Sequence, residues 1–254
     1  MNLLTRVREK VHQPGTLLLG YSIHSVIGMG SYGVLYLATS PKTNKQVIIK
    51  QLRCRKLTKA GRESFNTEKE ILIKLSHPSL PKLLDSFTYL GKPYLVMSKV
   101  YGDNLDKLIF KEKKLFSKEE SFLLLEEVVK VVQYFHNNGI VHQDLRPPNI
   151  IVDGRKIGII DFGLADFINL DTELPSPSLM REKLPKSDFY ALGHTLLFVL
   201  YSSYSPSSKK KRTWEDELDL SKEEKHFIRR LLQIEEPFEN VAEVLLNLHL
   251  ILNR

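Results

Sequence analysis

The spacing of apolar residues changes along the chain, and this change limits which folds the sequence can adopt. From Tyr21 to about Tyr94 the pattern is mostly strand-like, in YSIHSVIG, VLYLATS and KQVIIKQL, with a turn at PKTNK. One helix, at about Arg62 to Leu75, interrupts it. After Gly102 helical spacing dominates. The sequence therefore predicts an α+β fold with a sheet-forming first part and a helical second part.

Start and stop signals place the later elements. Ser117 with Glu120 forms a capping box before an apolar helical face that ends near Gly139, and Ser221 with Glu224 forms a second capping box. Helices are predicted at 187–203, 221–234 and 241–252, and the turn DGRK joins two short strands, IIV and KIGII. The predicted domain boundaries are an extension at 1–20, a small β-rich lobe at 21–97, a connector at 98–102 and a larger helical lobe at 103–254, with a cleft between the lobes.

Composition excludes several classes of protein. The 254 residues are 42% hydrophobic and 26% charged, as in ordinary globular proteins. The longest apolar stretch, LGHTLLFVLY, is far shorter than the roughly 20 residues that span a bilayer, so we expect no membrane anchor. The net charge of +7 lies in short surface-like runs without interleaved aromatic residues, so we do not expect nucleic-acid binding. A single cysteine and no secretory apolar segment indicate a cytoplasmic protein.

A loop interrupts two apolar runs at HQDLRPPN. Pro147 and Pro148 remove backbone donors and prevent a strand there. Asp144 and Asn149 lie five positions apart in this loop, so it can present a carboxylate and an amide oxygen together. The pattern indicates a functional site.

A glycine-rich turn lies between two predicted strands at GMGSYGVLYL. A dinucleotide-binding turn would open a helix and be followed by an acidic residue, but no Asp or Glu occurs between Gly33 and Glu63. The glycines are therefore predicted to lie in a hairpin turn. Their backbone amides can approach phosphate oxygens closely; the alternative is a merely tight hairpin.

Lys50 ends the apolar strand VIIK, where an unpaired ammonium group would be costly. Glu68 falls on the apolar stripe of the helix predicted at 62–75. We expect these two side chains to form an ion pair that directs the lysine toward a phosphate. The alternative is that Glu68 reaches solvent at the helix edge.

These motifs, in this order from about Tyr21 to the C-terminus, resemble the eukaryotic-type (Hanks-type) protein kinase family, in a compact single-domain form like that of bacterial members. GMGSYGV resembles the glycine-rich loop, VIIK the lysine strand and HQDLRPPN the catalytic loop, and Asp161-Phe162-Gly163 matches directly. The resemblance implies a bilobal kinase fold that transfers the γ-phosphoryl group of ATP, with Mg²⁺ or Mn²⁺, to serine or threonine hydroxyls of proteins.

The resemblance also implies a role for each matching residue. Asp144, Arg146 and Lys50 would be catalytic, Asn149 and Asp161 would bind the metal, and Asp188 would brace the catalytic loop. Met97 would be the gatekeeper, and residues 98–100 would face adenine. The full set implied for nucleotide binding is Ile27, Gly28, Met29, Gly30, Ser31, Tyr32, Gly33, Val34, Leu35, Lys50, Glu68, Met97, Val100 and Ile151. Candidate autophosphorylation sites are Thr172, Ser176 and Ser178.

The chain departs from the family pattern at several positions. Gln143 replaces the arginine that pairs with an activation-loop phosphate, and Ile48 brings extra bulk over adenine. Arg146 stands where a lysine is commoner, which leaves hydroxyl specificity open. No Ala-Pro-Glu follows Asp161, and its usual arginine partner is also missing. Two other functions therefore stay open: a pseudokinase that binds nucleotide or a partner without turnover, and a small-molecule phosphotransferase.

Overall fold

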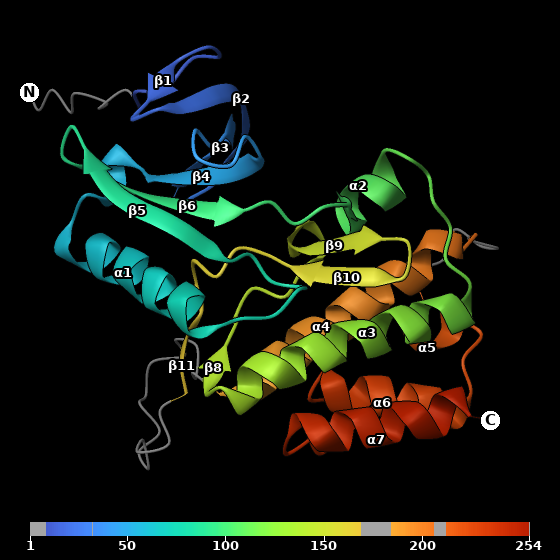
Figure 1. The fold of residues 1–254 in the computed structure, drawn as a ribbon. Coiled ribbons are helices and arrows are strands. Elements are labelled where there is room, and N and C mark those ends of the chain that lie inside the picture. The colour runs from blue at the N-terminus through green and yellow to red at the C-terminus, as the bar shows by residue number, and fades with distance from the viewer. Residues whose placement is uncertain (1–8, 32, 169–183, 206–211, 254) are drawn as a thin grey trace, which may run out of the picture. The chain divides into compact units, whose positions relative to one another are not determined.

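The computed structural model describes residues 9–31, 33–168, 184–205 and 212–253. The chain divides into two compact units (Figure 1). The N-terminal unit comprises Met1–His77 and Pro81–Lys99, and the C-terminal unit comprises Pro78–Leu80 and Val100–Arg254. A β-rich first unit and a larger, mainly helical second unit confirm the predicted bilobal fold.

The N-terminal unit is built on one antiparallel six-stranded sheet, ordered β1-β2-β3-β4-β6-β5. Its strands are β1 (Leu17–Leu18), β2 (Tyr21–Met29), β3 (Gly33–Thr39), β4 (Gln46–Leu52), β5 (Leu83–Tyr89) and β6 (Lys92–Ser98). Alternate residues of β3 and β4, among them Tyr36 and Ile49, are fully buried on one face. The core of this unit therefore lies on the face opposite Lys50.

Residues 9–18, which were predicted to lie in an extension outside the domain, pack on this sheet. Leu18 is 1% exposed, and β1 pairs with β2. The His12 Nε2 atom lies 2.9 Å from the Tyr94 hydroxyl, and the His12 ring contacts the rings of Tyr36 and Tyr89. The packed part of the N-terminal unit thus begins before residue 21.

Helix α1 (Lys59–Lys74) packs beside β5 in the same unit and follows a 3₁₀ turn at Cys54–Lys56 (Figure 1). It begins earlier than the predicted Arg62. The Thr58 hydroxyl accepts a hydrogen bond from the Gly61 amide and so caps the helix. The sequence-based prediction of this helix did not take Thr58 into account as an N-cap.

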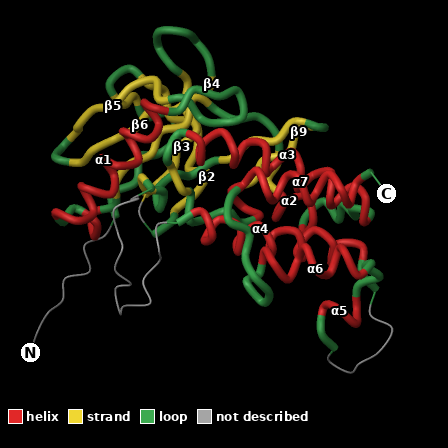
Figure 2. The backbone as a smooth tube through the Cα atoms, turned by 90° about the horizontal axis from the view of Figure 1, so that it is seen from below, coloured by secondary structure: helices red, strands yellow, loops and turns green. Residues whose placement is uncertain are grey.

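Among its described residues, the C-terminal unit contains four long helices. They are α3 (Lys118–Asn137), α4 (Pro185–Leu200), α6 (Lys222–Leu231) and α7 (Val241–Leu252). In this group α3 contacts α4 and α7, and α6 contacts α4 and α7 (Figure 2). Both predicted capping boxes are present, at the starts of α3 and α6. Gly139, with φ of 70°, follows the end of α3 as expected.

Short elements complete the unit. Strands β10 (Lys156–Ile159), β9 (Ile150–Asp153) and β7 (Asp103–Asn104) form one small sheet, and β8 (Ile140–Val141) pairs with β11 (Asp166–Phe167). Helices α2 (Leu105–Phe110) and α5 (Trp214–Glu217) were not predicted, because each is too short for a periodic pattern. The 3₁₀ turns are Pro147–Asn149 and Tyr201–Ser203. Among the described helices, none has the length and apolar character to cross a membrane.

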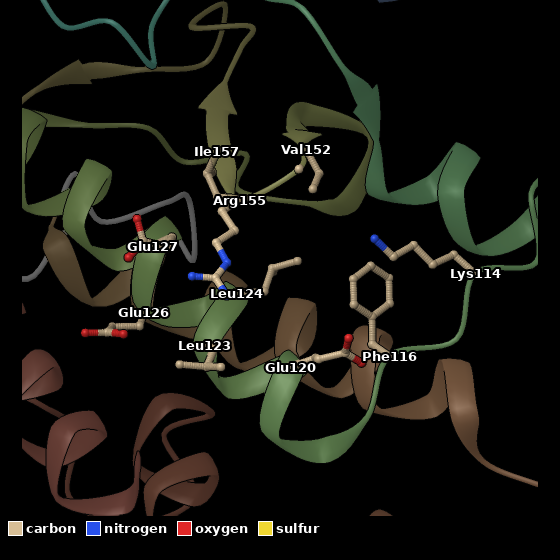
Figure 3. A pocket seen from close by; sticks show the side chains of 11 residues that line it. Lys114, Phe116, Glu120, Leu123, Leu124, Glu126, Glu127, Val152, Arg155 and Ile157 are labelled. Atoms are coloured by element: carbon tan, nitrogen blue, oxygen red, sulfur yellow. The ribbon is translucent and has the colours of Figure 1, made fainter. Parts of the chain in front are cut away.

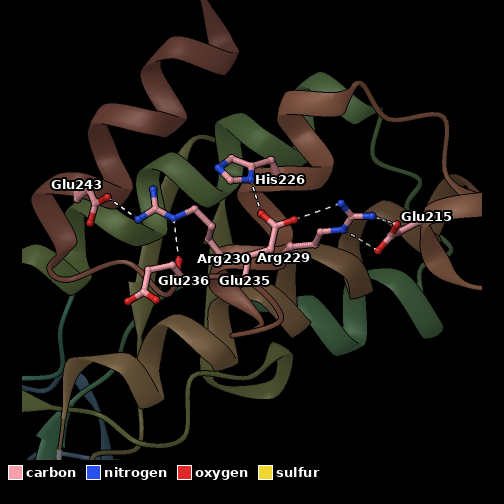
Figure 4. A network of polar contacts seen from close by, with 7 residues as sticks. All are labelled: Glu215, His226, Arg229, Arg230, Glu235, Glu236 and Glu243. Atoms are coloured by element: carbon pink, nitrogen blue, oxygen red, sulfur yellow. Dashed lines mark hydrogen bonds and ion pairs between the residues drawn. The ribbon is translucent and has the colours of Figure 1, made fainter.

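Arg229 and Arg230 tie α6 to its neighbours through ion pairs (Figure 4). Arg229 pairs with Glu215 of α5 and with Glu235. The Arg230 guanidinium donates to the Glu236 carbonyl and to Glu243 of α7, and lies 4.0 Å from the centre of the Phe238 ring. The Arg230 side chain is 15% exposed, against 35% for Arg229, so its contacts are less screened by solvent.

We expect Arg230→Ala to lower the free energy of unfolding by about 1–3 kcal/mol, since it removes two charge-assisted hydrogen bonds and a cation–π contact. The matched change Arg229→Ala should cost less, because that arginine is more exposed. Urea unfolding of both variants measures the difference. Equal losses would contradict the role assigned to Arg230.

Candidate active site

The predicted ion pair between Lys50 and Glu68 is present in the N-terminal unit. The Lys50 Nζ atom donates to Glu68 Oε1 at 2.7 Å and to Oε2 at 2.8 Å. The side chains are only 5% and 3% exposed. Two hydrogen bonds to one carboxylate fix the ammonium group of Lys50 beside α1, which supports the expectation from the apolar stripe of that helix.

The glycine-rich segment forms a hairpin turn between β2 and β3, as predicted. The Gly30 amide donates to the Gly33 carbonyl at 3.0 Å, and Met29 pairs with Val34. A Cβ atom at Gly33 would lie 2.9 Å from Lys50 Cγ. Glycine is required there because the Lys50 side chain crosses the backbone closely. Tyr32 lies outside the described residues.

The remaining predicted nucleotide-binding residues are distributed over both units. Met97 of β6 is 7% exposed and pairs with Ile48 of β4, which is partly exposed on the same face as Lys50. Val100 and Ile151 belong to the C-terminal unit. There, a Cβ atom at Gly158 would lie 2.4 Å from a Val100 methyl carbon, so Val100 packs directly on the backbone of β10.

Asp144 and Asn149 contact each other within the predicted catalytic loop of the C-terminal unit. The Asn149 side-chain amide donates to Asp144 Oδ2 at 2.8 Å and to the Asp144 carbonyl at 2.9 Å. Arg146 Nε lies 3.3 Å from Asp144 Oδ1, although the Arg146 side chain is 63% exposed. Asn149 is therefore oriented with its amide nitrogen toward Asp144, which leaves its Oδ1 atom for a cation.

Asp188 of α4 holds this loop through its carboxylate, as expected. Asp188 Oδ1 accepts a hydrogen bond from the backbone N–H of Gln143 at 2.7 Å. Oδ2 accepts from the His142 amide and from His136 Nε2, each at 2.8 Å. Asp188 is fully buried, and Gln143 has φ of 62°, a strained value for a side-chain-bearing residue. The carboxylate thus stabilises a backbone turn that would be unfavourable without it.

His142 is a second support that the sequence reading did not identify. Its Nε2–H donates to the Ile160 carbonyl at 3.1 Å, and its Nδ1 accepts from the Asp144 amide at 3.3 Å. Only the neutral ring can make both contacts. Burial lowers the pKa of His142, and this effect outweighs the nearby carboxylates of Asp188 and Asp161.

Thr195 also supports the loop: its hydroxyl donates to the Leu145 carbonyl at 3.2 Å. Thr195 lies seven residues, about two helical turns, after Asp188 on α4, so both side chains project from one face. That spacing was the available sequence signal.

Asp161 lies next to the Asn149 backbone. The Ile160 amide donates to the Asn149 carbonyl at 3.0 Å, and Asp161 has φ of 65°. Phe162 is 1% exposed and packs edge-on against His142 with ring centres 4.8 Å apart. In the described part of the chain, no group of three or more His, Cys, Asp or Glu side chains could hold a metal. One carboxylate and one amide oxygen nevertheless suit Mg²⁺, which commonly takes its other oxygens from water and phosphate.

A pocket of about 510 Å³ lies elsewhere in the C-terminal unit, between α3 and the β9–β10 turn (Figure 3). Its lining includes Leu124, Ile157 and Arg155, but none of the predicted site residues. Its carboxylates already have partners within the unit: Glu120 accepts from the Ser117 amide, and Glu126 and Glu127 both pair with Lys130. This pocket is therefore separate from the chemistry considered above.

Comparison with known proteins identifies the family. The protein kinase domain model matches residues 21–249. The chain is 37% identical over 230 residues to the probable serine/threonine-protein kinase YbdM of Bacillus subtilis, covering 88% of this chain and 86% of that protein. It is 29% identical over 249 residues to a probable myosin light chain kinase of Dictyostelium discoideum, covering 85% and 78%. The chain belongs to the protein kinase family.

The family match and the named relatives confirm the predicted resemblance and the predicted protein-kinase function. The candidate autophosphorylation sites Thr172, Ser176 and Ser178, and the segment where Ala-Pro-Glu is missing, lie outside the described residues.

We expect Asp188→Asn to lower the free energy of unfolding by about 1–3 kcal/mol, because the amide nitrogen cannot accept one of the buried backbone hydrogen bonds. The control Asp153→Asn, at an exposed strand end, should change it by less than about 0.5 kcal/mol. Denaturant unfolding measures both. Similar values for the two variants would rule out a bracing role.

The lowered pKa of His142 predicts that stability falls with acid. Below the ordinary histidine pKa of about 6.5, the unfolded chain binds a proton that the folded ring does not accept, so unfolding is favoured as pH falls. Above that pH the effect is absent. Urea unfolding of the parent and His142→Gln at pH 8 and pH 5.5 should show a smaller acid-induced loss in the variant. Parallel losses would contradict the assignment.

Proposed function

We propose that this protein transfers the γ-phosphoryl group of ATP to serine or threonine hydroxyls of protein substrates. The observation that carries the proposal is the fixed Asp144–Asn149 pair in a loop that Asp188 holds from the protein interior. Relatives named as serine/threonine kinases support the choice of hydroxyl. The family match over residues 21–249 favours this function over a small-molecule phosphotransferase.

In this proposal Lys50 contacts the nucleotide phosphates, and Glu68 holds its ammonium group in place. The Gly30 amide of the turn at residues 28–33 donates to the Gly33 carbonyl, and other backbone amides of this turn contact the same phosphates, with the neighbouring positions from Ile27 to Leu35 shaping the turn. Met97, Val100 and Ile151 contact the base. The buried ion pair supports the lysine assignment, because it stops the ammonium group from turning away.

Asp144 is proposed to accept the proton of the substrate hydroxyl while the oxygen of that hydroxyl forms a bond to the γ-phosphorus of ATP. The bond from that phosphorus to the bridging oxygen breaks, and ADP leaves with the electron pair. Arg146 places positive charge beside Asp144 and the transferred group. Asn149 and Asp161 would hold Mg²⁺ or Mn²⁺, which neutralises phosphate charge. We also propose a cytoplasmic location, supported by the single cysteine, Cys54.

A pseudokinase that binds nucleotide or a partner without turnover is the second candidate function, and the bulk of Ile48 supports it. Ile48 shares the face of Lys50 on β4 and places a branched side chain where the family has a small one.

Asp144→Asn should lower phosphoryl transfer to a mixed serine, threonine and tyrosine peptide panel by about 10²–10⁴-fold, because the amide cannot accept the proton. Nucleotide affinity should stay within about threefold of the parent. Radiolabel transfer, nucleotide titration and phosphosite mapping, including Thr172, Ser176 and Ser178, measure these outcomes. The exposed Asp153→Asn serves as control.

A parent that binds Mg-ATP but labels nothing would favour the second candidate. Radiolabel transfer that persists in Asp144→Asn would contradict the proton-acceptor role of Asp144. Transfer confined to tyrosine peptides would overturn the serine/threonine assignment.

A further inference from the structure

Two arginines from the segment after β4 bind carbonyl groups at the glycine-rich turn. Arg53 Nη1 donates to the Gly30 carbonyl at 2.9 Å, and Arg55 Nη2 donates to the Ser31 carbonyl at 3.2 Å. Both contacts lie within the N-terminal unit. The turn is thus held from its carbonyl side by cationic groups.

Arg53 is oriented by Glu9, a residue upstream of the region that the family model matches. The Arg53 Nε atom lies 3.6 Å from Glu9 Oε2, at ion-pair distance, and the Glu9 side chain is only 9% exposed. The Cys54 amide donates to Glu9 Oε2 at 2.9 Å, and Lys92 Nζ donates to Oε1 at 3.1 Å. The carboxylate therefore joins the N-terminal segment to the segment after β4 and to β6.

The charge state of Glu9 suits this role. Burial alone would raise its pKa, but the hydrogen bonds from Cys54 and Lys92 outweigh burial and hold the pKa below its ordinary value. Glu9 is consequently a carboxylate at neutral pH, as an ion pair with Arg53 requires.

The faces of β4 show what this arrangement does to the turn. Lys50 and Gln51 are successive strand residues, so their side chains point to opposite faces. Gln51 Nε2 donates to Glu9 Oε1 at 3.2 Å, which places Glu9 on the face away from Lys50. The Arg53 guanidinium, whose Nε atom lies at ion-pair distance from Glu9, donates to the Gly30 carbonyl. The Gly30 carbonyl and the Ser31 N–H belong to the same trans peptide, in which these two groups point in opposite directions. The Ser31 N–H is therefore directed away from Arg53.

We propose that Glu9 and Arg53 are positioning residues for the nucleotide: they hold the glycine-rich turn with the Gly30 carbonyl toward Arg53 and the Ser31 N–H directed away from Arg53, where it can meet a phosphate. The inference rests on the proposed ATP-binding function and deepens it. It makes the segment around Glu9 a part of the nucleotide-binding machinery, although it precedes residues 21–249.

The matched control is Arg62, whose Nη2 donates to the Gly91 carbonyl at 3.1 Å in a different turn of the same unit. Both arginines make an exposed guanidinium-to-glycine-carbonyl bond, but only Arg53 touches the glycine-rich turn. Arg53→Ala should weaken Mg-ATP binding by about threefold to tenfold and raise KM for ATP more than it lowers kcat. Arg62→Ala should leave both within about twofold.

Glu9→Gln tests the second link. It keeps an acceptor for the Cys54 amide but removes the charge beside Arg53, so Mg-ATP affinity should fall by about twofold to threefold. In Glu9→Gln combined with Arg53→Ala, the affinity should match that of Arg53→Ala alone, because Glu9 acts through Arg53. Unfolding midpoints measured in parallel detect a general loss of stability.

Equal effects of Arg53→Ala and Arg62→Ala on Mg-ATP affinity would overturn the positioning role, as would fully additive effects of Glu9 and Arg53. These readouts are binding constants, so they are independent of turnover. A parent that binds Mg-ATP without transferring phosphate would sink the proposed function alone, whereas a parent with no affinity for Mg-ATP would sink both.

Discussion

The carboxylate of Asp188 accepts three hydrogen bonds in a site with no solvent exposure, and the geometry of the catalytic loop depends on it. A buried carboxylate is costly unless its oxygens are satisfied, so the Asp188 side chain and the loop amides require each other. The strained turn at Gln143 persists because this pairing outweighs its backbone cost. Thr195 adds a second contact from the same helix, and His142 connects the loop to Ile160.

The same physical logic operates in the N-terminal unit. Lys50 and Glu68 are both nearly buried, and either alone would be an uncompensated charge in a low-dielectric interior. Their bidentate contact, and the glycine at position 33 that lets the lysine chain pass, fix one side chain in one direction. Such rigidity is useful where a cation must meet a phosphate without reorganising, which the proposed function requires.

At the N-terminus, the packed structure begins before the region that the family model matches. The matched region begins at residue 21, yet Glu9, His12 and Leu18 are already packed on the sheet. The upstream segment packs on the sheet because it supplies partners for polar side chains there. The Tyr36 hydroxyl donates to the Gln51 side chain, and the Gln51 side-chain nitrogen donates to Glu9. A buried hydrogen-bond network of this kind needs the upstream segment to satisfy its members.

The sequence by itself determined the fold class, the capping boxes, the hairpin turn and the pairing of Lys50 with Glu68, because each follows from local periodicity or from the cost of burying a charge. The prediction placed the start of α1 too late, although Thr58 supplies a local cap, and it did not use the spacing of Thr195 from Asp188. The role of His142 and the contacts of Glu9 were decided only by the tertiary structure. A residue's hydrogen-bond partner across 40 or more positions depends on how elements pack, and spacing along one segment carries no information about that packing.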